Sequence, residues 1–183
     1  MSYGDLPMSV HAGLLTVAEF LKLPAPEEGR LELHHGEVVV MPPPKKGHQK
    51  IQDRALVLLK PLVAGKYVVR GEMAFRPAPE HEVWQADVGC VSLERDDATA
   101  DDEYLMGSPE LVVEVLSPSN TVDEINERMS ICLDNGCLSF WVLDPKRKRV
   151  SVTEGNITRH YAETGEIACS ILAGEIRVRD IFE

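Results

Sequence analysis

The 183-residue chain lacks the features that would direct it into a membrane or out of the cell. No segment contains the roughly 18 consecutive apolar residues that a membrane-spanning helix needs. The N-terminal stretch MSYGDLPMSVHAGLL has neither a basic leader nor a continuous apolar core, and this argues against a secretory signal. We therefore expect a cytoplasmic protein with no membrane partner.

Cysteine is scarce, and its spacing excludes the common zinc-binding patterns. There is no C-x-x-C pair and no histidine at zinc-finger spacing. Cys132 and Cys137 fall in a predicted helix and in the loop after it, where small buried thiols are ordinary. We expect packing residues rather than a structural zinc site from the four cysteines, which are Cys90, Cys132, Cys137 and Cys169.

Positive charge is also in deficit. The chain has 19 Lys and Arg against 30 Asp and Glu, a net charge of -11, which opposes any general electrostatic coating of nucleic acid. Negative charge is concentrated in residues 94–103, and each charged run is most simply interpreted as a solvated loop or turn. A local basic patch stays possible, because Lys45, Lys46, Lys50 and residues 146–149 form two basic runs.

The remaining composition is that of a folded protein, with 44% hydrophobic and 27% charged residues. Its length predicts one domain over residues 1–183. A helix at 121–136 lies between two strands that should be parallel, which favours a mixed α/β fold. Apolar periodicity and turn signals predict helices at 14–24, 45–65 and 121–136, hairpins at 29–44 and 149–162, an acidic loop at 94–103, and strands at 67–75, 83–93, 109–116 and 138–145.

Glu114 interrupts an apolar strand within the stretch PELVVEVLSPSN. Because strand side chains alternate faces, Glu114 shares a face with Val112 and Leu116. A buried carboxylate without a partner is costly, so the chain must pair it, expose it or give it a cation. An arginine in a structural ion pair is one solution, and a metal ion is another.

Two further acids favour a metal ion. Asp87 lies in the middle of the predicted strand 83–93, on the face opposite Ala86 and Val88. Carboxylates on neighbouring strands repel each other unless a divalent cation or a shared proton lies between them, and oxygen ligands suit Mg²⁺ or Mn²⁺. Glu32 alternates with Leu31 in the first hairpin, and by itself is typical of a solvent-facing strand residue.

Several segments together resemble a known family. GRLELHHGEVVVMPPP, QADVGCV, PELVVEVLSPSNT and FWVLDPKRKRVSV are similar in order and content to the Uma-two family of the PD-(D/E)xK nuclease superfamily. This resemblance extends over residues 16–182 and implies a restriction-endonuclease-like core, a mixed central sheet flanked by helices with added β-hairpins. It also implies a Mg²⁺- or Mn²⁺-dependent endonuclease that hydrolyses phosphodiester bonds of DNA.

The resemblance also assigns roles to individual residues. Asp87 and Glu114 match the two acids of the superfamily motif and would hold the metal ion. Glu32 matches an acid supplied by the first hairpin and would be an accessory metal ligand. His48 matches a histidine at the start of the second helix, where it could orient the attacking water or simply be a polar residue near a helix N-terminus.

The sequence departs from the superfamily pattern at two positions. Ala86 replaces the proline before Asp87, a change that does not touch the metal. Leu116 replaces the lysine two residues after Glu114, and the residue that matches a lysine supplied by the next helix is Arg128. Arginine keeps the positive charge but exchanges no proton near neutral pH. Alternatively, Arg128 pairs with Glu114 and there is no catalysis.

These alternatives predict different proteins. A metal-dependent endonuclease would contact DNA through Lys45, Lys46, Lys50 and the 146–149 run. A catalytically silent relative would bind nucleic acid or a protein on the same scaffold, and hydrolysis of another phosphate ester is a third possibility. Strand edges and proline-rich segments also favour a homodimer.

Overall fold

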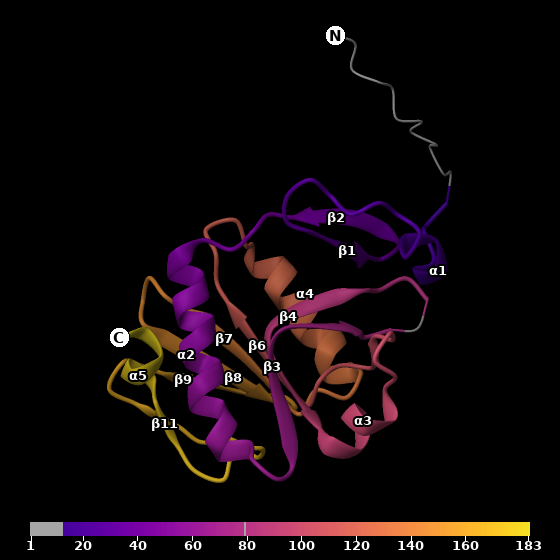
Figure 1. Ribbon diagram of the computed structural model, residues 1–183. Helices are drawn as coiled ribbons and strands as arrows, with labels where there is room; N and C mark the ends of the chain where they lie inside the picture. The colour runs from indigo at the N-terminus through magenta and orange to yellow at the C-terminus, as the bar shows by residue number, and fades with distance from the viewer. Residues whose placement is uncertain (1–12, 79) are drawn as a thin grey trace.

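A computed structural model describes residues 13–78 and 80–183. Its centre is a seven-stranded mixed sheet in the order β5-β3-β4-β6-β7-β8-β9 (Figure 1). This arrangement confirms the predicted mixed α/β fold. The strands are β3 (Tyr67–Arg76), β4 (Trp84–Ser92), β5 (Leu105–Met106), β6 (Leu111–Val115), β7 (Ser139–Asp144), β8 (Arg149–Glu154) and β9 (Ile157–Tyr161).

Strands β6 and β7 run parallel, with Glu114 opposite Val142, and helix α4 (Val122–Asp134) connects them. The helix begins with a capping box, in which the Thr121 side chain accepts from the Glu124 N–H and the Glu124 carboxylate accepts from the Thr121 N–H. The predicted crossover is therefore confirmed. The capping box helps the helix to begin at this point, because it satisfies backbone N–H groups that the first turn of a helix leaves unpaired.

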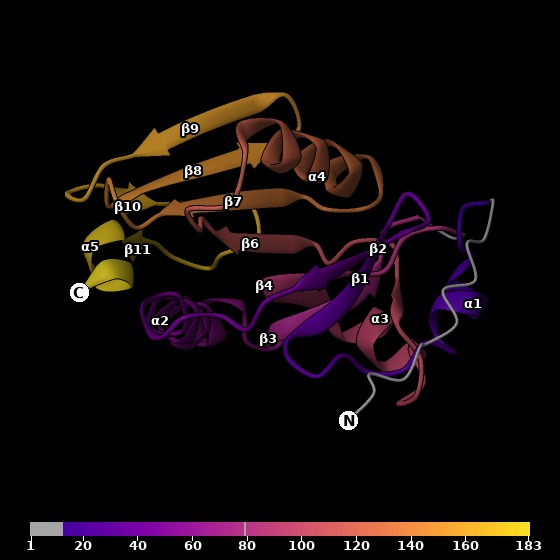
Figure 2. The same cartoon turned by 90° about the horizontal axis from the view of Figure 1, so that it is seen from above.

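The two faces of the sheet are covered by different helices, as Figure 2 shows. Helix α2 (Lys46–Val63) packs Ile51, Ala55 and Leu59 into the larger apolar cluster, together with residues of helix α5 (Val178–Phe182). Helix α4 packs against the opposite face, where Cys132 is fully buried. In the described part of the chain, no helix is both long and apolar enough to cross a membrane.

The first hairpin lies across the start of β4. Strands β1 (Arg30–His34) and β2 (Glu37–Met41) are joined by His35 and Gly36, both with positive φ, which is the geometry of a tight two-residue turn. Leu33 and Val83 exchange two backbone hydrogen bonds of 2.9 Å. Helix α1 (Val17–Phe20) packs against this junction and completes a small third apolar cluster.

Several short elements were not predicted. The segment expected as an acidic loop instead begins with helix α3 (Leu93–Ala98), which is held to β3 by an ion pair between Asp96 and Arg70. Strands β10 (Glu166–Ile167) and β11 (Ile176–Arg177) precede α5 and help to cover the α2 face. Strands of two residues are too short to show a strand period in the sequence, and the acidic run hid the six-residue α3.

The cysteines lie where packing residues are expected. Cys90, Cys132 and Cys137 are buried, Cys169 is half-buried, and all of them are free thiols. Burial raises the pKa of the Cys90 thiol to about 12, so this side chain stays protonated and apolar at neutral pH.

Candidate active site

Strands β4 and β6 part at Asp87. The two strands are paired from Val88 to Cys90. Beyond that point the Asp87 side chain, and not its main chain, bonds to β6. Its Oδ2 accepts a hydrogen bond of 2.7 Å from the Val115 N–H. The carboxylate is therefore fixed in the gap between the two strands.

The pleat of β4 changes phase at the same residue, which corrects one prediction. Ala86 packs in the cluster on the α4 face, whereas Val88 packs in the cluster on the α2 face. Asp87 therefore does not lie opposite both neighbours, as regular alternation predicts. Glu72, across from Asp87 on β3, has a φ of 50°, so both strands are irregular where the acid is presented.

Helix α2 contributes two residues that hold Asp87. His48 Nε2 lies 2.9 Å from Asp87 Oδ1, so the structure brings these two predicted site residues together. Gln52 donates from Nε2 to the Asp87 main-chain oxygen across 2.7 Å. Gln52 was not among the predicted site residues, although its position four residues after His48 on the same helix face was a usable signal.

Arg128 joins three elements around Glu114. Its Nε donates to Glu114 Oε1 at 2.8 Å and its NH1 to Glu32 Oε2 at 3.3 Å. Its NH2 donates to the Gln85 main-chain oxygen at 2.6 Å. Of the alternatives that the sequence leaves open for Glu114, the structure contains the ion pair with Arg128.

Glu32 is 1% exposed, so its interpretation as a solvent-facing residue was wrong. The hairpin lies on the central sheet, and the polar face of β1 is covered by α4 and β4. Arg30 and His34, which share that face, bond to Glu32 at 3.1 and 2.9 Å. Burial opposes ionisation, but the His34 hydrogen bond and the charges of Arg128 and Arg30 lower the pKa of Glu32 to about 2.

Glu114 has the opposite electrostatic balance. Burial raises its pKa to about 8, the negative charges of Asp87 and Glu32 add to this, and Arg128 only partly offsets them. Burial alone would lower the pKa of Arg128, but Glu114 and Glu32 hold it above the ordinary value. Ionised Glu114 is thus disfavoured by its burial and by the two neighbouring acids, and a proton or a further cation would stabilise it.

The donor set fits a magnesium-like ion. Mg²⁺ is commonly held by one or two carboxylates, with water and substrate phosphate completing the shell. Asp87 and Glu114 supply two such carboxylates. In residues 13–78 and 80–183, no three His, Cys, Asp or Glu side chains are grouped as a complete metal site.

Leu116 adds no charge to the site. Its side chain is half-buried, and its N–H donates to the Leu143 main-chain oxygen across 2.9 Å, continuing the β6–β7 ladder. The cation that touches Glu114 thus comes from α4 and not from β6.

Trp84 and Glu82 were missed by the sequence analysis. The Arg128 guanidinium carbon lies 5.0 Å from the centroid of the Trp84 ring. The Trp84 Nε1 donates to Glu82 Oε2 at 2.8 Å, and Glu82 is 5% exposed. Glu82 precedes the predicted strand 83–93 and Trp84 lies within it, so strand alternation did not link the two residues.

The two basic runs lie outside the carboxylate cluster. Lys46 and Lys50 are exposed and, two residues either side of His48, point away from the face that His48 turns toward Asp87. In the turn between β7 and β8, Arg147 pairs with Asp144 at 3.0 Å and Lys148 with Glu163 at 2.6 Å. Their positive charge is partly neutralised within the chain.

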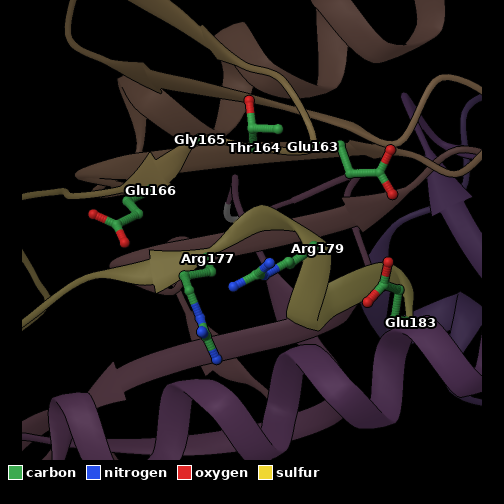
Figure 3. Close-up of a pocket in the computed structure, with 7 residues that line it drawn as sticks. All are labelled: Glu163, Thr164, Gly165, Glu166, Arg177, Arg179 and Glu183. Atoms are coloured by element: carbon green, nitrogen blue, oxygen red, sulfur yellow. The ribbon is translucent and has the colours of Figure 1, made fainter.

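A shallow hollow lies elsewhere, between the β10–β11 region and α5 (Figure 3). It has mixed charge, and its Arg177 already pairs with Asp180 at 2.8 Å. None of the predicted site residues lines it. The lining residues are Glu163, Thr164, Gly165, Glu166, Arg177, Arg179 and Glu183.

Comparison with protein families decides the assignment. The sequence profile of Uma2, described as "Putative restriction endonuclease", matches residues 17–168. The chain belongs to the Uma2 family. This confirms the resemblance seen in the sequence, and a nuclease of the restriction-endonuclease-like class is the description that comes with it.

A solved structure supports the same fold. It is that of "a putative nuclease belonging to DUF820" from Anabaena variabilis ATCC 29413, with a TM-score of 0.78 and 20% identity to this Uma2 chain. The match covers 92% of this chain and 97% of the other. No curated protein sequence matches the chain. At this identity, the structural likeness shows the fold.

Proposed function

We propose that this Uma2 protein is a Mg²⁺- or Mn²⁺-dependent endonuclease that hydrolyses phosphodiester bonds of DNA. The observation that supports it most is the convergence of Asp87 and Glu114 where the pairing of β4 and β6 ends. Such a pair of acids suits a divalent cation, because burial and the neighbouring acids oppose ionisation of Glu114 and Arg128 offsets them only in part.

In this proposal Asp87 and Glu114 hold the ion, which when bound polarises the phosphate and lowers the pKa of an attacking water. The chain's own contacts prepare Asp87 for that task. The Val115 N–H and His48 occupy one oxygen each, and Gln52 fixes the main chain beneath it. His48 is also the group best placed near Asp87 to orient a water molecule.

Arg128 takes the place of the superfamily lysine. It favours the ionised form of Glu114, which is the form that binds a metal, and it adds positive charge where phosphate would lie. Because a guanidinium does not exchange protons near neutral pH, Arg128 acts through charge alone. Glu32 holds one side of the guanidinium and is the proposed accessory acid.

A catalytically silent binding module is the second candidate. The ion pair between Arg128 and Glu114 favours it, because the pair accounts for the buried acid without any metal. The absence of a lysine at Leu116 points the same way. The two candidates differ in whether the chain binds a divalent cation and cleaves DNA.

Nicking of supercoiled plasmid in Mn²⁺ tests the proposal. Wild-type protein should nick the plasmid and Asp87→Asn should not, because the amide no longer offers two anionic oxygens. Glu110→Gln is a matched control, since Glu110 is also a largely buried, arginine-paired acid but lies at the other end of β6. No nicking by wild type with any divalent metal would favour the silent module. Turnover of a small phosphodiester without nicking would indicate a different phosphate ester.

DNA contact by the basic runs and a homodimer are further parts of the proposal. Lys45, Lys46, Lys50 and residues 146–149 would meet phosphates at the periphery of the protein. The strand edge best suited to dimer contact is β2, where Val38, Val39 and Val40 are 36–59% exposed. The edge strand β9, by contrast, presents Arg159 and His160.

A further inference from the structure

The segment Glu82–Val83–Trp84 contacts both the first hairpin and Arg128. Val83 exchanges two backbone hydrogen bonds of 2.9 Å with Leu33, the neighbour of Glu32. Glu82 and Trp84 flank Val83, and a hydrogen bond joins their side chains. Each of these residues thus contacts a different part of the candidate site.

Glu82 uses both carboxylate oxygens. Oε1 accepts the His35 main-chain N–H at 3.0 Å and lies 2.9 Å from His35 Nδ1. Oε2 accepts the indole N–H of Trp84 at 2.8 Å. His35 is the first turn residue of the hairpin and also reaches Glu127 on α4 at 3.2 Å. One buried acid therefore ties the hairpin tip to the tryptophan.

Trp84 in turn supports Arg128. The guanidinium carbon lies 5.0 Å from the indole centroid, and the His34 ring lies 5.4 Å from the same indole. Cations over the face of a tryptophan are attracted by its quadrupole, more strongly where water is excluded. The orientation of the indole plane thus bears on where Arg128 lies between Glu114 and Glu32.

We propose that Glu82 is a positioning residue of this site, setting Arg128 through Trp84 and Glu32 through the hairpin. Glu82 itself touches neither proposed metal ligand, so it acts through these neighbours. When Glu82 cannot hold both partners, Arg128 shifts from its contact with Glu114.

Glu82→Gln is a sharp test because it keeps the shape of the side chain. A glutamine amide has one acceptor oxygen and an NH₂ group that only donates. It can accept from Trp84 or from His35, but it cannot serve both with separate oxygens. Trp84→Phe is the second variant, since it keeps an aromatic face below Arg128 and removes the N–H that bonds Glu82.

Nuclear magnetic resonance tests, without any metal, whether Glu82 sets the positions of Trp84 and Arg128. The chain has two tryptophans, so there are two indole N–H signals, and the Trp141 Nε1–H bonds to Ser139 Oγ at 3.0 Å, away from Glu82. In Glu82→Gln we expect the Trp84 indole and Arg128 Nε–H signals to shift and exchange faster with water. The Trp141 signal should stay unchanged, whereas general damage to the fold would move all of them.

Mn²⁺ affinity tests whether the position of Arg128 matters to the site, and this experiment rests on the proposed function. We expect both variants to bind Mn²⁺ about fivefold more weakly than wild type, the effect of one lost hydrogen bond. Glu110→Gln should match wild type.

The resonance measurement and the Mn²⁺ titration can each contradict the proposal independently of the other. If the Trp84 signal moves while the Arg128 signal stays as in wild type, Glu82 only anchors the tryptophan and the positioning role is wrong. Unchanged Mn²⁺ affinity in both variants would also overturn it. If wild type binds no Mn²⁺, the proposed metal site fails, and the Arg128 signal still decides the role of Glu82.

Discussion

Arg128 donates its Nε–H to Glu114 Oε1 across 2.8 Å, so a helix supplies the cation for the acid that interrupts β6. The same guanidinium reaches Glu32, 96 residues away in the sequence. This pair accounts for a charge in an apolar strand. It also sets the conditions under which Glu114 could exchange its arginine partner for a metal ion.

Metal binding should be lost when either strand acid is removed. We expect calorimetry to detect Mg²⁺ or Mn²⁺ binding in wild type and none in Asp87→Ala or Glu114→Ala. Because the pKa of Glu114 is about 8, binding at pH 7 should release a proton, and the affinity should rise as the pH increases from 6 to 8. Heats measured in two buffers of different ionisation enthalpy reveal that proton. Unchanged binding in both variants would rule out these ligands.

Removing Arg128 should destabilise the fold. Arg128→Leu leaves Glu32 and Glu114 buried without their shared cation, and we expect a loss of about 3–5 kcal/mol in the free energy of unfolding. Arg128→Lys should lose less, since it keeps the charge but not the planar fork. Arg147→Leu is the control, because Arg147 is 66% exposed and such pairs contribute about 1 kcal/mol or less. Urea unfolding measures all three, and equal losses would contradict this account.

Glu32 should make the protein sensitive to acid. Its folded pKa of about 2 lies below the ordinary value of 4.5, so its ionised form stabilises the fold above pH 4.5. That contribution is lost as the pH falls from 4.5 toward 2. Glu32→Gln should therefore show a flatter decline in unfolding free energy over this range, whereas the surface variant Glu163→Gln should follow wild type. Parallel curves for wild type and Glu32→Gln would refute the assignment.

The β2 edge should govern any self-association. Val40 is 59% exposed, and a lysine there would block strand pairing between copies while leaving the monomer intact. We expect light scattering to show a dimer for wild type and a monomer for Val40→Lys. Val57→Lys, at a 65% exposed position on α2, should remain dimeric. A monomeric wild type at every concentration would end the dimer proposal.

The sequence determined the larger elements and the two central acids. Helices α2 and α4 have apolar positions at helical spacing, and α4 also has its capping box, so both were readable locally. Asp87 and Glu114 could be identified because a carboxylate within an apolar strand is costly unless it has a partner. Family resemblance added His48 and Arg128 to the candidate set and gave Glu32 the role of an accessory acid.

Only the tertiary structure decided how these groups meet. Burial of Glu32 and the support of Arg128 by Trp84 and Glu82 depend on the contacts of the hairpin with the start of β4 and with α4. The surroundings of Asp87 depend on β6 and α2. The local pattern of Glu32 is that of an exposed strand. Its buried state arises from contacts with residues far along the chain, and strand alternation contains no information about them.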